Sequence, residues 1–62
     1  MEKPRCSLVG QNGNIFNLMG IAAKTLKEAG REKEADEMVK RTVESKNYNK
    51  ALGIIMEYVE VE

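Results

Sequence analysis

The sequence predicts a mainly α-helical single domain of three helices, with a short two-stranded β-ribbon formed by the N- and C-terminal segments. Apolar residues recur with the period of a helix over three stretches, which are separated by Gly30 and by residues 45–47. The segments 5–9 and 59–62 are instead short and have the pattern of strands. We expect 1–62 to form one domain, because 62 residues leave room for no more.

The chain is expected to begin with a flexible polar tail over 1–4, followed by a strand from Arg5 to Val9. This run is short and apolar, and a glycine follows it, which is the pattern of a brief strand. Successive side chains of a strand point to opposite faces, so Cys6 and Leu8 share one face.

A tight turn is predicted between this strand and the first helix, at Gly10, Asn12, Gly13 and Asn14. An Asn-Gly pair tolerates positive φ, and either Asn14 or Asn12 can cap the helix by accepting from its free amides. The same outward amides, at the positive end of a helix dipole, could instead hold a phosphate or carboxylate. The turn is therefore a candidate anion-binding site, although its spacing matches neither a dinucleotide fold nor a P-loop.

The chain resembles a family of small uncharacterised bacterial proteins of about this length, some carried on phages and other mobile elements. The resemblance covers nearly the whole chain and depends on the pattern Leu8-x-Gly10-x-Asn12-Gly13-Asn14-x-Phe16-x-Leu18-x-Gly20, with the ending Tyr58-Val59-Glu60-Val61. Members more often carry Asp where this chain has Asn12, so this turn lacks a charge that a metal or catalytic role would use. The resemblance implies the architecture and no assigned activity.

The first helix is predicted from Ile15 to Ala29, with Gly30 as its left-handed stop. Its apolar residues cover an arc roughly 160° wide, from Leu18 at one edge to Phe16 at the other. So wide an arc indicates contact with more than one neighbour.

The second helix is predicted to begin at Arg31 or Glu32 and to end at Glu44 or Ser45. It carries a narrow apolar stripe and is charged elsewhere, with i,i+4 pairs such as Glu37–Arg41, and is therefore a surface helix. The stripe consists of Ala35, Met38, Val39, Thr42 and Val43.

The third helix is predicted after Ser45 or Asn47, either of which can be its N-cap. One arc of this helix carries Tyr48, Ala51, Leu52, Ile55, Met56, Tyr58 and Val59. The segment 59–62 then alternates like a strand and has only 5–9 as a partner, in a direction that the pattern leaves open. We expect the first helix to pack beneath this ribbon, because two strands alone are marginal.

Composition excludes several kinds of chemistry. There is no histidine and one cysteine, so we expect no internal disulfide, no zinc site, no cofactor and no activated nucleophile, and hence no enzyme. Ten basic and ten acidic side chains give zero net charge, and we expect no binding to nucleic acid. No apolar run is long enough to span a bilayer and no signal-like segment is seen, so we expect a cytoplasmic protein without a membrane partner.

Two glycines interrupt helical patterns and each is followed by an isoleucine that lies off the apolar arc, as Gly20-Ile21 and Gly53-Ile54. A glycine inside a helix costs about 1 kcal/mol relative to alanine, which suggests close approach by another backbone. That neighbour could be part of the same chain or a second copy of it. We therefore expect self-association, as a homodimer, as one possibility at Gly20, Ile21, Gly53 and Ile54.

The sequence thus favours a small non-enzymatic protein-interaction or accessory module that binds another protein or itself through an apolar surface. The alternative is a small-ligand or anion site at Gly10, Asn12, Gly13 and Asn14.

Overall fold

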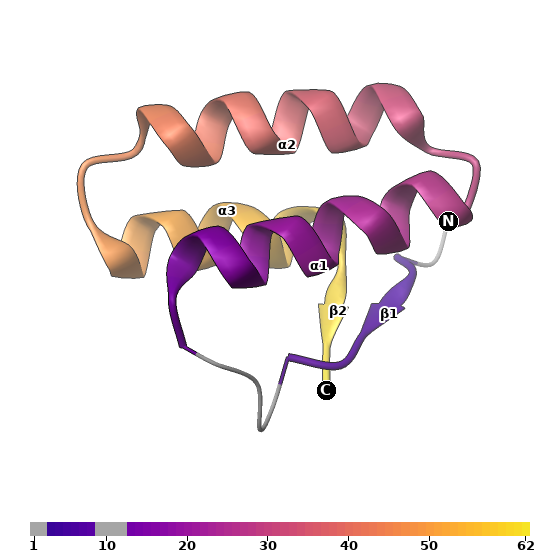
Figure 1. The fold of residues 1–62 in the computed structure, drawn as a ribbon, viewed down its shortest axis with the longest axis horizontal. Helices are drawn as coiled ribbons and strands as arrows, with labels where there is room; N and C mark the ends of the chain where they lie inside the picture. Colours follow the sequence, from indigo (N-terminus) through magenta and orange to yellow (C-terminus); the bar gives the residue numbers. More distant parts are fainter. Residues whose placement is uncertain (1–2, 9–12) are drawn as a thin grey trace.

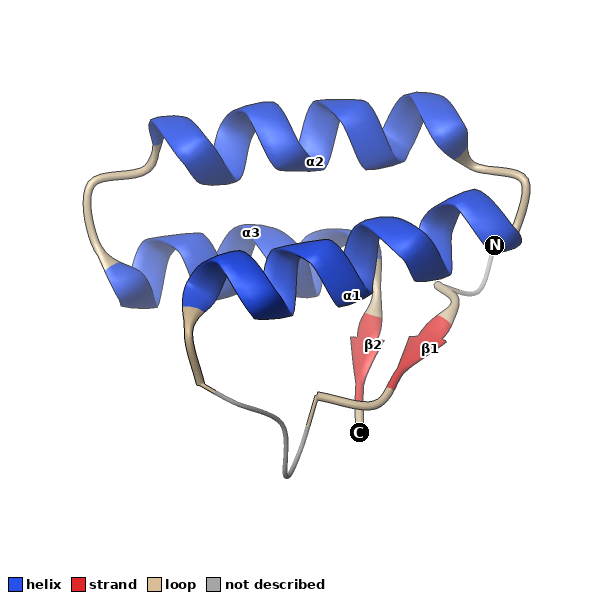
Figure 2. Ribbon diagram, viewed as in Figure 1, coloured by secondary structure: helices blue, strands red, loops and turns tan. Residues whose placement is uncertain are grey.

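The computed structural model describes residues 3–8 and 13–62 of the chain. The elements follow in the order β1 (Arg5–Cys6), α1 (Ile15–Glu28), α2 (Glu32–Glu44), α3 (Tyr48–Tyr58) and β2 (Glu60–Val61). The predicted class is confirmed, with three helices and a two-stranded ribbon from the two ends of the chain. Figure 1 shows the helices lying side by side, with the ribbon below α1 and α3, and Figure 2 shows how little of the chain is strand.

The ribbon is parallel, which settles the direction that the sequence left open. Arg5 lies opposite Glu60, and Cys6 lies opposite Val61. The Glu60 and Glu62 amides donate to the Pro4 and Cys6 carbonyls at 2.9 and 3.0 Å, and the Leu8 amide donates to Glu62 at 3.0 Å.

Each strand is shorter than the segment predicted for it. The pairing covers 5–6 and 60–61, while Val9 lies outside the described residues. Of the expected tail, Lys3 and Pro4 are both engaged: the Lys3 ammonium donates to the Met56 carbonyl at 2.9 Å, and Pro4 accepts from the ribbon.

Local side chains set where α1 begins and ends. Asn14 is its N-cap, because the side-chain oxygen accepts from the Phe16 amide at 2.8 Å. Gly30 follows with a φ of 77°, and its amide donates to the Lys27 carbonyl at 3.0 Å, which confirms it as the left-handed stop.

The connection from α2 to α3 is also built from side-chain hydrogen bonds. The Ser45 hydroxyl donates to the Thr42 carbonyl at 2.6 Å as α2 ends. Asn47 then accepts from the Lys50 amide at 2.8 Å and is the N-cap of α3. Of the two residues that the sequence offered as N-caps of the third helix, Asn47 is the N-cap, whereas Ser45 is the C-cap of α2.

The core lies between the three helices and extends to the ribbon. Its largest fully buried side chains come from every layer and are Cys6, Leu26, Met38, Ile55 and Val59. Cys6 faces α1, where the Thr25 hydroxyl donates to its sulfur at 3.5 Å, so α1 does pack against the ribbon as expected.

Four large apolar side chains predicted to face the core are exposed instead. Phe16 is 66% exposed, Val43 59%, Met56 49% and Tyr48 45%. Phe16 lies at the edge of the wide arc of α1, and Val43 at the edge of the narrow stripe of α2. A period identifies the centre of an apolar face well, but the packing of neighbours decides whether its edges are covered.

Polar side chains join α2 to α3 on the outer surface. Arg41 binds Glu57 through two hydrogen bonds of 3.0 and 3.2 Å and donates to the Tyr58 hydroxyl at 3.0 Å. The Tyr58 hydroxyl in turn donates to Glu37. The pairing predicted between Glu37 and Arg41 within α2 is thus replaced by bonds that both residues make to α3.

Candidate functional site

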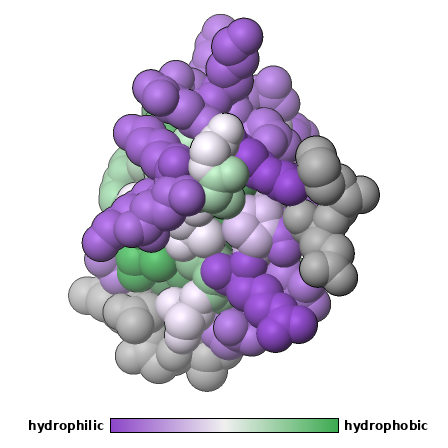
Figure 3. Space-filling model, turned by 90° about the vertical axis from the view of Figure 1, so that its right-hand side faces the viewer, coloured by the Kyte–Doolittle hydropathy of each residue, from purple (hydrophilic) through white to green (hydrophobic). Residues whose placement is uncertain are grey.

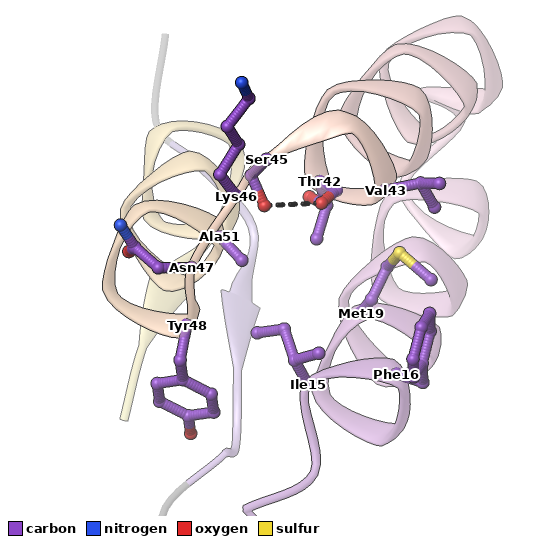
Figure 4. A pocket seen from close by; sticks show the side chains of 10 residues that line it. All are labelled: Ile15, Phe16, Met19, Thr42, Val43, Ser45, Lys46, Asn47, Tyr48 and Ala51. Atoms are coloured by element: carbon purple, nitrogen blue, oxygen red, sulfur yellow. Dashed lines mark hydrogen bonds between the residues drawn. The ribbon is translucent and has the colours of Figure 1, made fainter.

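A pocket lies at the end of the molecule where α1 begins, α2 ends and α3 begins (Figure 4). We call it the end pocket. Its volume is about 190 Å³. Its walls are mostly apolar and consist of Ile15, Phe16, Met19, Thr42, Val43, Ser45, Lys46, Asn47, Tyr48 and Ala51.

The two asparagine caps explain why these residues meet. Asn14 starts α1 and Asn47 starts α3 at the same end of the bundle, so the first turns of both helices border the pocket (Figures 1 and 4). Ile15 and Tyr48 are the first residues of those helices. The third side is the last turn of α2, which Ser45 ends.

The pocket has an apolar side and a polar side. Figure 4 shows Phe16, Met19 and Val43 close together on one side, and Lys46, Asn47 and Tyr48 on the other. The apolar side includes Phe16 and Val43, the two most exposed large apolar residues of the described chain. Such a surface can take up an apolar group and offers no side chain positioned for bond chemistry.

A buried hydroxyl lies in the wall of the pocket. Thr42 is 5% exposed, and its Oγ1 is the buried side-chain polar atom of the described residues that has no hydrogen-bond partner. An unpaired buried hydroxyl is uncommon in folded proteins because it loses its hydrogen bonds to water.

The opposite end of the molecule has a different character. Figure 3 shows the side on which α1 ends and α2 begins, and hydrophilic residues cover most of it. A shallow hollow there is lined by Gly30, Arg31, Glu32, Lys33, Glu34 and Asp36, which are nearly all charged. Of the four exposed large apolar residues of the described chain, Phe16, Val43 and Tyr48 line the end pocket.

The described half of the predicted anion-binding turn lies beside the end pocket. A Cβ added to Gly13 would come within 3.8 Å of the Tyr48 hydroxyl. The Asn14 side chain is already used as the cap of α1, which occupies one of the free amides. Gly10 and Asn12 lie outside the described residues.

The four residues predicted for self-association are divided between two helices and two environments. Ile21 and Ile54 are half-buried and pack against the core, so they leave less apolar surface than their off-arc positions predict. Gly20 and Gly53 are exposed, and a Cβ added to either would meet no described atom within 4 Å. Close approach from within the described chain therefore does not explain these glycines.

The two isoleucines also face different neighbours. Ile21 is one helical turn from Thr25, whose hydroxyl bonds to Cys6 of β1. Ile54 is one turn from Tyr58, whose hydroxyl bonds to α2. Self-association at Gly20, Ile21, Gly53 and Ile54 stays a prediction.

None of the residues that line the end pocket, Phe16, Thr42, Val43 and Tyr48 among them, was predicted as a site from the sequence. They were assigned to helix faces by their period, which is a local property. Whether three helix ends leave a hollow between them depends on how the helices pack, and no local pattern encodes that. The one available signal was the width of the α1 arc, which indicated contact with more than one neighbour.

Other groups that could carry chemistry are few in the part of the chain that the structure describes. No three His, Cys, Asp or Glu side chains among 3–8 and 13–62 gather in a way that could hold a metal ion. Cys6 is a buried free thiol. No described helix combines the length and the apolar character needed to cross a membrane.

Comparison with protein-family models, with curated proteins and with solved structures finds no match to this chain.

Proposed function

We propose that the protein is a small non-enzymatic interaction module that binds another protein chain by taking an apolar side chain into the end pocket. The observation that carries this proposal is the apolar side of that pocket, where Phe16 is 66% and Val43 59% exposed beside a hollow. Exposed apolar groups gathered next to a cavity are typical of surfaces that bind proteins.

The size of the pocket favours a side chain over a cofactor or metabolite. Pockets for small-molecule ligands usually measure about 300–1,000 Å³. The end pocket, at about 190 Å³, is smaller. A cavity of about 150 Å³ is enough for one benzene ring, so one aromatic or branched side chain of a partner is the occupant that fits.

We further place this module in the bacterial cytoplasm, as an accessory protein of a mobile element. The buried free thiol of Cys6 supports a reducing compartment, and the resemblance of the sequence to small bacterial proteins supports the origin. The zero net charge supports a protein as the partner and not a nucleic acid.

A capture experiment tests the proposal. The tagged protein is incubated with extract from the organism that encodes it, and bound proteins are identified by mass spectrometry. The variant Phe16→Asp should lose a partner that the wild type retains, because a charge replaces the ring at the pocket rim. An acidic residue in the first turn of a helix is favourable, so α1 should still fold.

Met56→Asp is the matched control, because Met56 is also an exposed apolar residue and lies on α3 outside the pocket lining. It should keep the partner. Loss of the partner in both variants, or in neither, would remove the end pocket as the binding surface.

A second candidate is an anion or small-ligand site at the turn, favoured by the position of Gly13 beside Tyr48 and by the two helix N-termini at this end. A thermal-shift screen of nucleotides, sugar phosphates and carboxylates separates the two. Stabilisation by one of these compounds that Gly13→Val abolishes would support the turn and count against the module.

A further inference from the structure

The outer edge of β1, on the side away from β2, has backbone groups that bind no described residue. The bonds to β2 are made by the Pro4 and Cys6 carbonyls and by the Leu8 amide. Backbone groups of successive strand residues face alternate edges, so the amides and carbonyls of Arg5 and Ser7 face away from β2. None of these groups is hydrogen-bonded within the described chain. Both residues are exposed, so the edge is open to another molecule.

An open edge of this kind can be completed by a further strand. An added strand supplies a carbonyl to each free amide and an amide to each free carbonyl, as when extended peptides bind to the edges of sheets. The ribbon has two strands, and two strands alone are marginal, so a third would also stabilise it. The groups at Arg5 and Ser7 therefore form a site for one extended segment.

The charges around this edge determine which segment fits. A shallow hollow at the start of β1 is lined by Lys3, Pro4, Arg5, Ala29, Arg31 and Glu60. Figure 1 shows this start of β1 just below the end of α1. Arg31 already pairs with Glu34 at 3.8 Å. Lys3 and Arg5 are exposed and Glu60 is the one carboxylate of the lining, so an approaching strand meets an excess of positive charge.

We propose that the outer edge of β1 binds an extended acidic segment of a partner protein, which joins the ribbon as a third strand. The main chain of the segment bonds to Arg5 and Ser7. Alternate side chains of a strand share one face, so carboxylates at every second position reach the face of the Arg5 guanidinium. The Lys3 ammonium, held by its bond to the Met56 carbonyl, adds a second cation.

This inference goes beyond the proposed function, because it uses a different surface and a different kind of contact. The end pocket lies where α1 begins and takes an apolar group. The open edge lies where α1 ends and takes a charged main-chain segment (Figure 1). Either surface can therefore be lost while the other stays.

Charge also argues against a second copy of the chain as the occupant. Two copies joined through β1 about a two-fold axis would bring Lys3 and Arg5 of both chains together, and like charges on neighbouring strands are destabilising. Cations on an open edge serve to keep identical edges apart. The acidic β2 of a copy fits no better, since the Glu60 and Glu62 amides already bond to its own β1. The strand that fits comes from a different, acidic chain.

Nuclear magnetic resonance of the isotope-labelled protein tests the proposal. The probe is a capped peptide of alternating glutamate and valine, and its match is the same peptide with lysine in place of glutamate. The acidic peptide should shift the amide signals of Arg5 and Ser7 and slow their hydrogen exchange, because these amides gain partners. It should bind roughly tenfold or more tightly than the lysine peptide.

Ser7→Pro separates strand addition from charge attraction alone. Proline has no amide to donate, and it is tolerated on an edge strand where the amide faces outward. The bonds to β2 come from Pro4, Cys6 and Leu8 and stay in place. Ser7→Pro should therefore weaken binding of the acidic peptide by roughly tenfold. Ser7→Ala is the matched control, because it keeps the amide and should leave binding unchanged.

Arg5→Gln tests the contribution of charge. It keeps the backbone groups of the edge and should weaken binding of the acidic peptide by roughly two- to fivefold, because an exposed ion pair is lost. Lys50→Gln removes an exposed cation at the start of α3 and should leave binding unchanged.

Several results would overturn the proposal. One is equal binding of the two peptides, and another is the absence of protection at the Arg5 and Ser7 amides of the wild type at saturating acidic peptide. Equal binding by Ser7→Pro and Ser7→Ala would mean that charge alone holds the peptide. If Ser7→Pro does not fold, exchange at the wild-type amides decides the matter. A wild type that dimerises by light scattering, with Ser7→Pro monomeric, would make a second copy the occupant instead.

Discussion

Tyr58 shows how one side chain can serve the core and the surface together. Its ring is buried at 8% exposure, while its hydroxyl donates to Glu37 and accepts from Arg41. Burial of the phenol raises the pKa of Tyr58 above its usual 10.0, the bond to Glu37 raises it further, and Arg41 opposes both. The bonds to Glu57 and Tyr58 raise the pKa of Arg41, which stays charged.

Removing the hydroxyl should weaken the join between α2 and α3. We expect Tyr58→Phe to lower the free energy of unfolding by about 1 kcal/mol at neutral pH, because two partly buried hydrogen bonds are lost. Chemical denaturation measures this change in the free energy of unfolding. Tyr48→Phe is the control: because Tyr48 is 45% exposed, the substitution should change the free energy of unfolding little. An equal loss in both variants would contradict the role given to the network.

The raised pKa of Tyr58 also determines the direction in which stability changes at alkaline pH. Because the folded pKa of Tyr58 lies above the unfolded value, its contribution to stability is complete below about pH 10 and is lost as pH rises through the folded pKa. The wild type should therefore lose more stability than Tyr58→Phe above pH 10. The same denaturation series, continued into that range, compares the two.

At the scale of elements, the residues that stop and start helices have the clearest roles. Asn14, Gly30 and Asn47 each use a local property, either a capping oxygen or a backbone that accepts positive φ. For that reason the bounds of all three helices could be predicted from the sequence to within a residue or two. The candidate site could not, because the end pocket depends on how three helix ends pack and because Phe16 and Val43 lie at face edges.

Alanine substitutions at two glycines, Gly30 and Gly53, should change stability in opposite directions, because only Gly30 has a positive φ among the two. Gly30→Ala should lower the free energy of unfolding by about 1–2 kcal/mol, because a side chain at a φ of 77° is strained. Gly53→Ala should raise it by up to about 1 kcal/mol, because the added methyl meets open space within α3 and alanine favours the helix. Thermal or chemical unfolding measures both, and a shift of the same sign in the two variants would contradict the assignment.

At the scale of the whole molecule, the ribbon joins segments from the two ends of the chain. Arg5 pairs with Glu60, and in the sequence all three helices lie between these two strands. The existence of this pairing could be predicted because no other strand was available. Its direction could not, since that depends on the path of the chain through three helices and not on any residue within the strands.

The parallel direction of this ribbon has a mechanical consequence. If the chain is pulled from the N-terminal side of β1 and the C-terminal side of β2, the two strands are drawn past each other along their own axes. The three hydrogen bonds that Leu8, Glu60 and Glu62 donate then bear the load together. An antiparallel pair held in the same way would open one bond after another. The join between β1 and β2 is thus a clamp loaded in shear, which resists tension applied to the two ends while leaving the helices behind it unloaded.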